Sequence, residues 1–137
     1  MGTQENVQLV EKAYANFKQG NIAAILEVLS EDVDWFIPGP TEIIPFVGRR
    51  LGPRQVGEFF AALAESQTAL EFEPREFISQ GEKVIVFGYQ RWNVKSTGRP
   101  YGDDWAHVFT IRNGKIAQFR EYHDTHAEAA AHKPKIL

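Results

Sequence analysis

Hydrophobic residues recur at spacings of three and four in the first part of the chain, and this period predicts two helices. The first apolar stripe consists of Val7, Val10, Tyr14 and Phe17. We expect its helix to begin after an N-cap at Thr3 and to stop at Gly20. Asn21 can cap a second, shorter helix that ends at Ser30-Glu31-Asp32. The apolar face of this second helix carries Ile22, Ile25, Leu26 and Leu29.

A short strand, a hydrophobic loop and a third helix follow. The strand is expected at Val33–Ile37, where Pro38-Gly39-Pro40 stops it. The loop from Thr41 to Leu51 is rich in apolar residues, which suggests that it folds over something apolar. Pro53 suits the first turn of the third helix. The apolar side of that helix carries Val56, Phe59, Phe60 and Leu63.

From Leu70 onward the pattern is typical of long strands separated by turn residues. The expected strands are Leu70–Ser79, Lys83–Asn93, Tyr101–Ile111 and Lys115–His123. Consecutive strands with short turns predict an antiparallel meander, and helices followed by strands indicate an α+β fold. Residues 127–131 are compatible with a helical turn that Asp124-Thr125 caps and Pro134 ends. We find no repeat or linker and predict one domain over residues 1–137.

The register of the last hairpin decides which of its side chains share a face. A two-residue loop of Asn113-Gly114 would place His107 opposite Arg120. A three-residue loop with Gly114 as a left-handed bulge would place His107 opposite Phe119 instead. We favour the second register, which gathers on one face Trp105, His107, Phe109, Ile111, Ala117, Phe119 and Glu121. It leaves Thr110, Gln118 and Arg120 on the other face, and a slip of one residue would exchange the two faces.

Composition limits the class of protein further. The 137 residues are 43% hydrophobic and carry a net charge of −3, with no basic cluster. These values argue against disorder and against nucleic-acid binding. No window is apolar enough to predict a membrane span. The chain has no cysteine, which suits a reducing compartment, and Met1–Asn6 lacks the features of a signal peptide. We therefore predict a cytoplasmic location.

Several motifs follow one another in a characteristic order. They are Gly20-Asn21 between two helices, Trp35-x-x-Pro38, Phe46-x-Gly48, Gly52, and Asn113-Gly114-Lys115-Ile116 before the end of the meander. This order resembles the SnoaL-like, or ketosteroid-isomerase-like, branch of the NTF2-like superfamily over nearly the whole chain. The resemblance implies an α+β cone, in which a strongly bent antiparallel sheet wraps around three N-terminal helices and encloses a deep cavity. It also implies frequent dimerisation through the sheet.

Members of this superfamily include isomerases, cyclases, epoxide hydrolases, dehydratases and non-catalytic binding modules, so function must be judged residue by residue. In the ketosteroid isomerases an aspartate base precedes a proline on the first strand, and the matching position here is Ile37. Their oxyanion tyrosine falls near Ala13, beside Tyr14, and their oxyanion aspartate falls near His107. Because the base is missing, we do not expect the same chemistry from the same residues.

Two other activities of the superfamily use carboxylates. The polyketide cyclase SnoaL has an acid/base aspartate on the final strand, and the comparable carboxylate here is Glu121, a little further along that strand. The epoxide hydrolases need an Asp-Arg-Asp arrangement. Arg91, Asp104 and Asp124 are available for those roles, although no spacing compels the assignment.

His107 and Glu121 form the sharpest candidate pair for catalysis. We expect them on adjacent strands, one diagonal step apart. The carboxylate would raise the pKa of the imidazole, and apolar surroundings would raise the pKa of the carboxylate, so the pair could transfer protons near neutral pH. Tyr14 could donate to a developing oxyanion, and Asp124 is a further candidate carboxylate. The alternative is a structural histidine beside an exposed glutamate.

Aromatic residues supply the expected pocket. Most of them would belong to the core of any fold, but we expect the tryptophans and Tyr14 to need hydrogen-bond partners where they are buried. The predicted pocket residues are Phe17, Trp35, Phe46, Phe59, Tyr89, Arg91, Trp105, Phe109 and Phe119.

A metal site at His123-Asp124-Thr125-His126, with His107 as third ligand, has poor spacing for a segment at the end of a strand, so we predict no metal. No Rossmann or P-loop motif is present, and no cofactor is expected. We predict that the protein binds a small, largely apolar organic molecule and catalyses cofactor-free proton transfer, as an isomerase, cyclase or hydrolase. The alternative is a non-catalytic binding or dimerisation module. A homodimer is expected through an outer face with Gln118, Arg120 and Tyr122.

Overall fold

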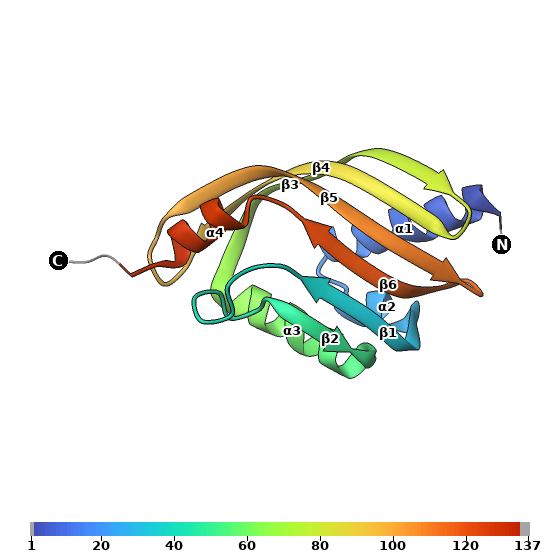
Figure 1. The fold of residues 1–137 in the computed structure, drawn as a ribbon, viewed down its shortest axis with the longest axis horizontal. Helices are drawn as coiled ribbons and strands as arrows, with labels where there is room; N and C mark the ends of the chain where they lie inside the picture. Colours follow the sequence, from blue (N-terminus) through green and yellow to red (C-terminus); the bar gives the residue numbers. More distant parts are fainter. Residues whose placement is uncertain (1, 135–137) are drawn as a thin grey trace.

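The computed structural model describes residues 2–134, in which a strongly curved six-stranded sheet bends around two helices (Figure 1). The elements in chain order are α1 (Thr3–Lys18), α2 (Ile22–Glu27), β1 (Leu29–Ile37), β2 (Gly48–Leu51), α3 (Gly52–Ser66), β3 (Gln67–Gln80), β4 (Lys83–Val94), β5 (Pro100–Arg112), β6 (Lys115–Tyr122) and α4 (Thr125–His132). Helix α1 packs against β3 and β4, and α3 packs against β1 and β2. The predicted α+β class is confirmed.

The strands lie in the order β2-β1-β6-β5-β4-β3, and the sheet does not close into a barrel. Strands β3 to β6 form the predicted antiparallel meander. The sheet is nevertheless mixed, because β1 runs parallel to β6, with Trp35 opposite Phe119. The loop predicted at residues 41–51 is wrong at its end, where β2 pairs with β1 and Gly48 lies opposite Ile37. Its apolar part does fold inward, since Phe46 is buried.

The N-terminal helices differ from the prediction at their ends. Gly2, not Thr3, is the N-cap of α1. Asn21 caps α2 as predicted, and its side chain accepts a hydrogen bond from Ala24 N at 3.3 Å. The predicted end of α2 at residues 30–32 is wrong. The carbonyl of Val28 accepts a hydrogen bond from Ile116 N at 2.8 Å, and this pairing draws the following residues into the sheet as β1.

A fourth helix closes one end of the molecule. The helical turn expected at residues 127–131 is a longer helix, α4, and Asp124 caps it by accepting from Ala127 N at 2.9 Å. Thr97, in the β4–β5 turn, donates to Ala131 O at 2.6 Å and ties the helix to the sheet. Figure 1 shows α4 at the opposite end of the sheet from the N-terminus.

The last hairpin combines a tight turn with a bulge. Arg112 lies opposite Lys115, so the loop is the two-residue one, and Asn113 and Gly114 have φ values of 53° and 73°. A register shift after Thr110 then adds one residue to β6 and places His107 opposite Glu121. The three-residue loop is therefore wrong. The predicted faces hold from Gln118 to Glu121, because the observed partner of His107 is two residues from the predicted one, but Ile116 rather than Ala117 lines the cavity.

A glycine in β4 makes room for a buried indole. Gly88 lies opposite Trp105 in the β4–β5 register, and a Cβ at Gly88 would collide with the Trp105 ring. The ring can therefore lie flat across β4. Its other neighbour is the imidazole of His107, stacked on it with ring centroids 3.9 Å apart.

Candidate functional site

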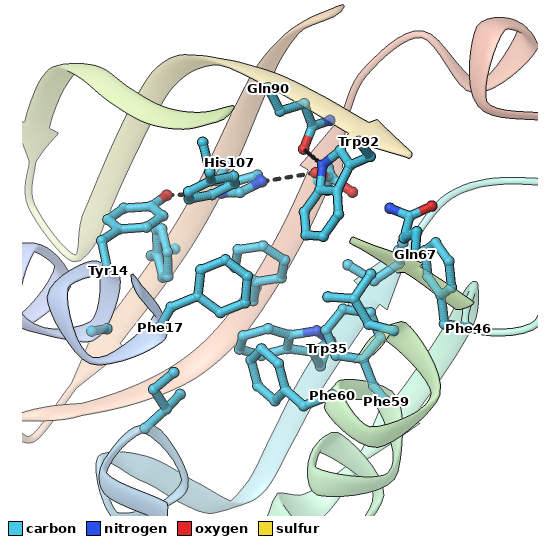
Figure 2. A pocket seen from close by; sticks show the side chains of 18 of the residues that line it. Tyr14, Phe17, Trp35, Phe46, Phe59, Phe60, Gln67, Gln90, Trp92 and His107 are labelled. Atoms are coloured by element: carbon cyan, nitrogen blue, oxygen red, sulfur yellow. Dashed lines mark hydrogen bonds and ion pairs between the residues drawn. The ribbon is translucent and has the colours of Figure 1, made fainter. Parts of the chain in front are cut away.

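An aromatic cavity of about 90 Å³ lies between the concave face of the sheet, α1 and α3 (Figure 2). Its aromatic lining consists of Tyr14, Phe17, Trp35, Phe46, Phe59, Phe60, Phe72, Trp92, Tyr101, Phe109 and Phe119. Sites for drug-sized ligands are roughly 300–1,000 Å³. The cavity therefore suits a small molecule, and a larger one must displace side chains.

A larger open groove of about 640 Å³ adjoins this cavity at the end of α1, the end of α3 and the start of β3. The two hollows share part of their walls: Phe17, Phe60, Leu63, Gln67, Phe72 and Trp92. The groove thus lies directly beside the cavity.

Six of the predicted pocket residues line the cavity: Phe17, Trp35, Phe46, Phe59, Phe109 and Phe119. Tyr89 and Arg91 do not, and their prediction is wrong by one position. Side chains alternate along β4, so Gln90 and Trp92 point inward instead. On the outer face the guanidinium of Arg75 lies 5.1 Å from the Tyr89 ring, and Arg91 pairs with Glu71.

Two further candidates lie outside the cavity lining. Trp105 is buried behind the wall, where it stacks on His107. Asp124 is the exposed cap of α4. Arg91 and Asp104 are exposed as well, so the arrangement considered for an epoxide hydrolase is not formed by these residues.

Tyr14, His107 and Glu121 form a hydrogen-bonded chain at the edge of the cavity (Figure 2). The hydroxyl of Tyr14 lies 2.8 Å from Nδ1 of His107, and Nε2 of His107 lies 2.9 Å from Oε2 of Glu121. Helix α1 supplies Tyr14, and the β5–β6 register places the other two directly opposite each other. With Glu121 ionised, Nε2 donates to the carboxylate and Nδ1 accepts from the tyrosine.

The pKa values of His107 and Glu121 shift in the direction opposite to the prediction, since both are lowered. Burial lowers the pKa of His107, and the hydrogen bond and charge of Glu121 offset this only in part. Burial acts to raise the pKa of Glu121, but the hydrogen bond from His107 and the positive charge of His123 outweigh it and hold that pKa below its usual value. Burial and the charge of Glu121 raise the pKa of Tyr14 well above its ordinary value. Near neutral pH the chain is therefore a neutral phenol, a neutral imidazole and a carboxylate.

His123 lies in a cluster of carboxylates that the sequence did not reveal. Its Nδ1 is 2.9 Å from Oδ2 of Asp103, and its Nε2 is 3.3 Å from Oε1 of Glu128 and 3.7 Å from Oε1 of Glu121. Burial lowers the pKa of His123, but the hydrogen bond to Asp103 and the negative charges of Glu128 and Glu121 raise it to about 11. His123 is therefore an imidazolium. The alternation Phe119, Glu121, His123 was the signal that it points inward.

A second polar group occupies the end of the cavity near α4. Tyr101 donates to Oε2 of Glu128 at 2.5 Å and accepts from Nε2 of Gln67 at 2.8 Å. Nε2 of His132 lies 3.0 Å from Oε1 of Gln67. Nothing in the sequence marked these residues, because Gln67, Tyr101 and α4 are distant in the chain and belong to no motif.

Residues 2–134 contain no group of histidine, aspartate or glutamate side chains arranged to hold a metal ion. His126, the second ligand considered at the end of β6, is exposed, whereas His123 points into the carboxylate cluster. Within the same residues, no helix is long and apolar enough to cross a membrane.

A bent sheet around helices, enclosing an aromatic cavity with a few polar groups, defines the NTF2-like class of α+β proteins. The chain belongs to its SnoaL-like family, whose domain model matches residues 10–119. It is similar to the structure of an NTF2-like protein from Burkholderia xenovorans LB400, with 38% identity, 97% of this chain and 99% of that chain covered, and a TM-score of 0.88.

Two other solved structures are similar over nearly their whole length. TerC, co-crystallised with polyporic acid, is 30% identical, with 93% of this chain and 97% of that chain covered and a TM-score of 0.81. An NTF2-like protein of unknown function from Burkholderia pseudomallei K96243 is 26% identical, with 98% and 100% covered and a TM-score of 0.85. A search of curated proteins returns no match.

Proposed function

We propose that the cavity binds a small, largely apolar organic molecule bearing oxygen, and that Tyr14, His107 and Glu121 transfer a proton to or from it without a cofactor. The observation that carries this proposal is the hydrogen-bonded chain of these three residues at the edge of an otherwise aromatic cavity. An apolar cavity with a few convergent polar groups is typical of a small-molecule site. The co-crystallisation of TerC with polyporic acid supports an organic ligand in a related fold.

The geometry suggests how the proton moves. Both ring nitrogens of His107 are engaged, so a ligand reaches the imidazole through the hydroxyl of Tyr14. The tyrosine oxygen accepts a proton from a carbon acid of the ligand while its own proton passes to Nδ1 of His107. The resulting imidazolium is stabilised by the carboxylate of Glu121. Return of the proton to another carbon completes an isomerisation. Attack of the ligand carbanion on a carbonyl, followed by return of the proton to the resulting alkoxide oxygen, completes a cyclisation.

This proposal is tested by hydrogen–deuterium exchange at the α-carbons of cyclopentanone, a ketone small enough for the cavity, followed by NMR in D₂O. The native protein is expected to accelerate exchange. Tyr14→Phe should reduce this acceleration about 100-fold, in line with the usual contribution of a positioned acid–base group. Tyr122→Phe is the matched control because Tyr122 lies on the outer face, half exposed, and it should leave the rate unchanged. Equal rates with and without the native protein would contradict the proposal.

A second candidate function is binding without turnover. It is favoured by the hydrogen bonds that three polar lining residues, Tyr14, Gln67 and Tyr101, already make to other side chains. In that case cyclopentanone would bind, and NMR shifts of the cavity residues would detect the binding. The α-protons of cyclopentanone would exchange no faster than they do in buffer without the protein.

We also propose that two copies associate through the outer face of the sheet. Ile78, Phe87 and Tyr122 are between 41% and 50% exposed there. Near them the guanidinium of Arg120 lies 4.5 Å from the Phe36 ring and 5.2 Å from the Tyr122 ring. Light scattering should give the mass of a dimer at micromolar concentration, and Phe87→Glu should give a monomer because it places a charge in the apolar contact. A monomer mass for the native protein at every concentration would contradict this.

A further inference from the structure

The indole N–H of Trp35 is a hydrogen-bond donor without a partner in the cavity wall. Trp35 is 5% exposed, and its Nε1 is buried without a hydrogen bond among the residues described. Buried donors are almost always paired, because leaving one unpaired costs free energy. The indole of Trp92, which also lines the cavity, shows the usual situation, since it donates to Gln90 Oε1 at 2.8 Å. Trp105 Nε1 is unpaired too, but its ring lies behind the wall.

Packing fixes the orientation of the Trp35 ring. The ring stacks on Phe119 with centroids 4.0 Å apart and an interplanar angle of 21°, and Phe60 meets it edge-on at 5.6 Å. The N–H therefore cannot turn to find a partner in the protein. Figure 2 shows Trp35 across the cavity from His107.

Trp35 and the imidazole of the hydrogen-bonded chain belong to the same part of the cavity wall. The Phe119 ring lies between them, 4.0 Å from the Trp35 centroid and 4.8 Å from that of His107. The indole N–H of Trp35 is a neutral hydrogen-bond donor. The cavity lining also contains the carboxylates of Glu121 and Glu128. An anionic ligand would be repelled by these carboxylates, whereas a neutral acceptor oxygen would satisfy the indole.

We propose that Trp35 Nε1 donates a hydrogen bond to a neutral carbonyl oxygen of the cavity's ligand and so selects ketones, enones or quinones over hydrocarbons of the same shape. This inference rests on the proposed function, because it needs a ligand in the cavity. It adds the class of the ligand and the residue that recognises it.

The test compares cyclopentanone with methylenecyclopentane, which has the same shape but carries C=CH₂ in place of C=O. Dissociation constants are measured by NMR titration for the native protein, for Trp35→Phe and for Trp92→Phe. Trp35→Phe should raise the dissociation constant of cyclopentanone about tenfold, the ratio that corresponds to 1.4 kcal/mol. It should change the dissociation constant of methylenecyclopentane less than twofold. Trp92→Phe is the matched control, because its N–H is already used by Gln90, and it should change both affinities by the same factor.

The native protein provides a second readout that does not depend on a variant folding. The indole N–H resonance of Trp35, assigned through its proximity to the Phe119 ring, should move downfield with cyclopentanone and not with methylenecyclopentane. An unmoved resonance, or a Trp35→Phe variant that weakens both probes equally, overturns the inference and leaves the proposed function standing. Failure of both probes to bind the native protein at millimolar concentration overturns the proposed function and this inference together.

Discussion

His107 is enclosed by groups that fix both its orientation and its charge. Trp105 stacks on one side, Tyr14 occupies Nδ1 and Glu121 occupies Nε2. Burial favours the neutral ring, while Glu121 favours the imidazolium, and burial is the larger effect. The proton affinity of His107 is therefore set by a balance that a single substitution can shift.

Replacing Glu121 by Gln keeps the size of the side chain and removes its charge. We expect the pKa of the His107 ring to fall further, because the interaction that raises it is lost while burial remains. NMR titration of the His107 ring measures this directly. Glu82→Gln is the control, because Glu82 is exposed and pairs with Arg112, and it should leave the titration unchanged. An unaltered His107 titration in Glu121→Gln would mean that the two side chains are not coupled.

For individual residues, the sequence predicted those on strands where inward hydrophobic and outward polar side chains alternate clearly. It missed the residues on strands without this alternation. His107 and Glu121 alternate with apolar inward residues on their strands, and their contact was predicted. In β4 the inward positions include Gly88 and Gln90, which are not hydrophobic. The hydrophobic pattern therefore does not reveal which side chains of this strand face inward, and the prediction of Tyr89 and Arg91 as pocket residues is wrong. The carboxylates around His123 come from β5, β6 and α4, and no local pattern links them.

Among the elements, β6 depends on a bulge for its orientation. The tight turn alone would place Arg120 opposite His107 and turn Glu121 outward, and the extra residue after Ile116 reverses this. The functional face of β6 is thus a product of the turn and the bulge together.

Inserting one alanine after Ala117 should add a residue that the one-residue bulge does not absorb, and Arg120 would then fall opposite His107. The hairpin must then bury the charge of Arg120 or distort its turn, and we expect a loss of unfolding free energy of about 3–5 kcal/mol, the usual cost of a buried unpaired charge. Urea unfolding measures it. Ala117→Gly keeps the chain length and should cost only about 1 kcal/mol. Equal stability of the insertion and the glycine variant would show that the bulge does not set the faces.

Local elements were largely predictable from the sequence, and distant pairings were not. Pro53 lies in the first turn of α3 as expected, and the four long strands lie where the turn residues separate them. The short strand β2 and the parallel pairing of β1 with β6 were missed, because each depends on a partner far away in the chain. The same pairing explains why the boundary between α2 and β1 was misplaced.

For the whole molecule, the buried imidazolium of His123 links stability to pH. Its pKa in the folded state is about 11, above its value near 6.5 in the unfolded chain, so the folded state holds the proton over that interval. The stabilisation is fully present below pH 6.5 and is lost as the pH rises toward 11. His107 acts in the opposite sense: with its folded pKa lowered, its contribution is lost as the pH falls below 6.5.

We therefore expect the free energy of unfolding to fall between pH 7 and pH 9, below the range in which the tyrosines of the unfolded chain ionise. His123→Gln should be less stable at pH 7 and should remove most of this slope. Urea unfolding at several pH values provides the measurement, with His126→Gln as control because His126 is exposed. A slope that persists unchanged in His123→Gln would refute this assignment.

The contact between Gly88 and Trp105 limits which substitutions this sequence can accept during evolution. No side chain fits at position 88 while an indole occupies position 105, and the indole in turn supports the imidazole of His107. Neither position can be replaced independently without disturbing the site. Among homologous proteins, a residue larger than glycine at position 88 should accompany a small residue at position 105 and a shift of β3, whose Glu73 carbonyl oxygen would lie 2.5 Å from the new Cβ. Lineages that have made this exchange should also have lost the histidine at position 107, and with it the reaction proposed for this cavity.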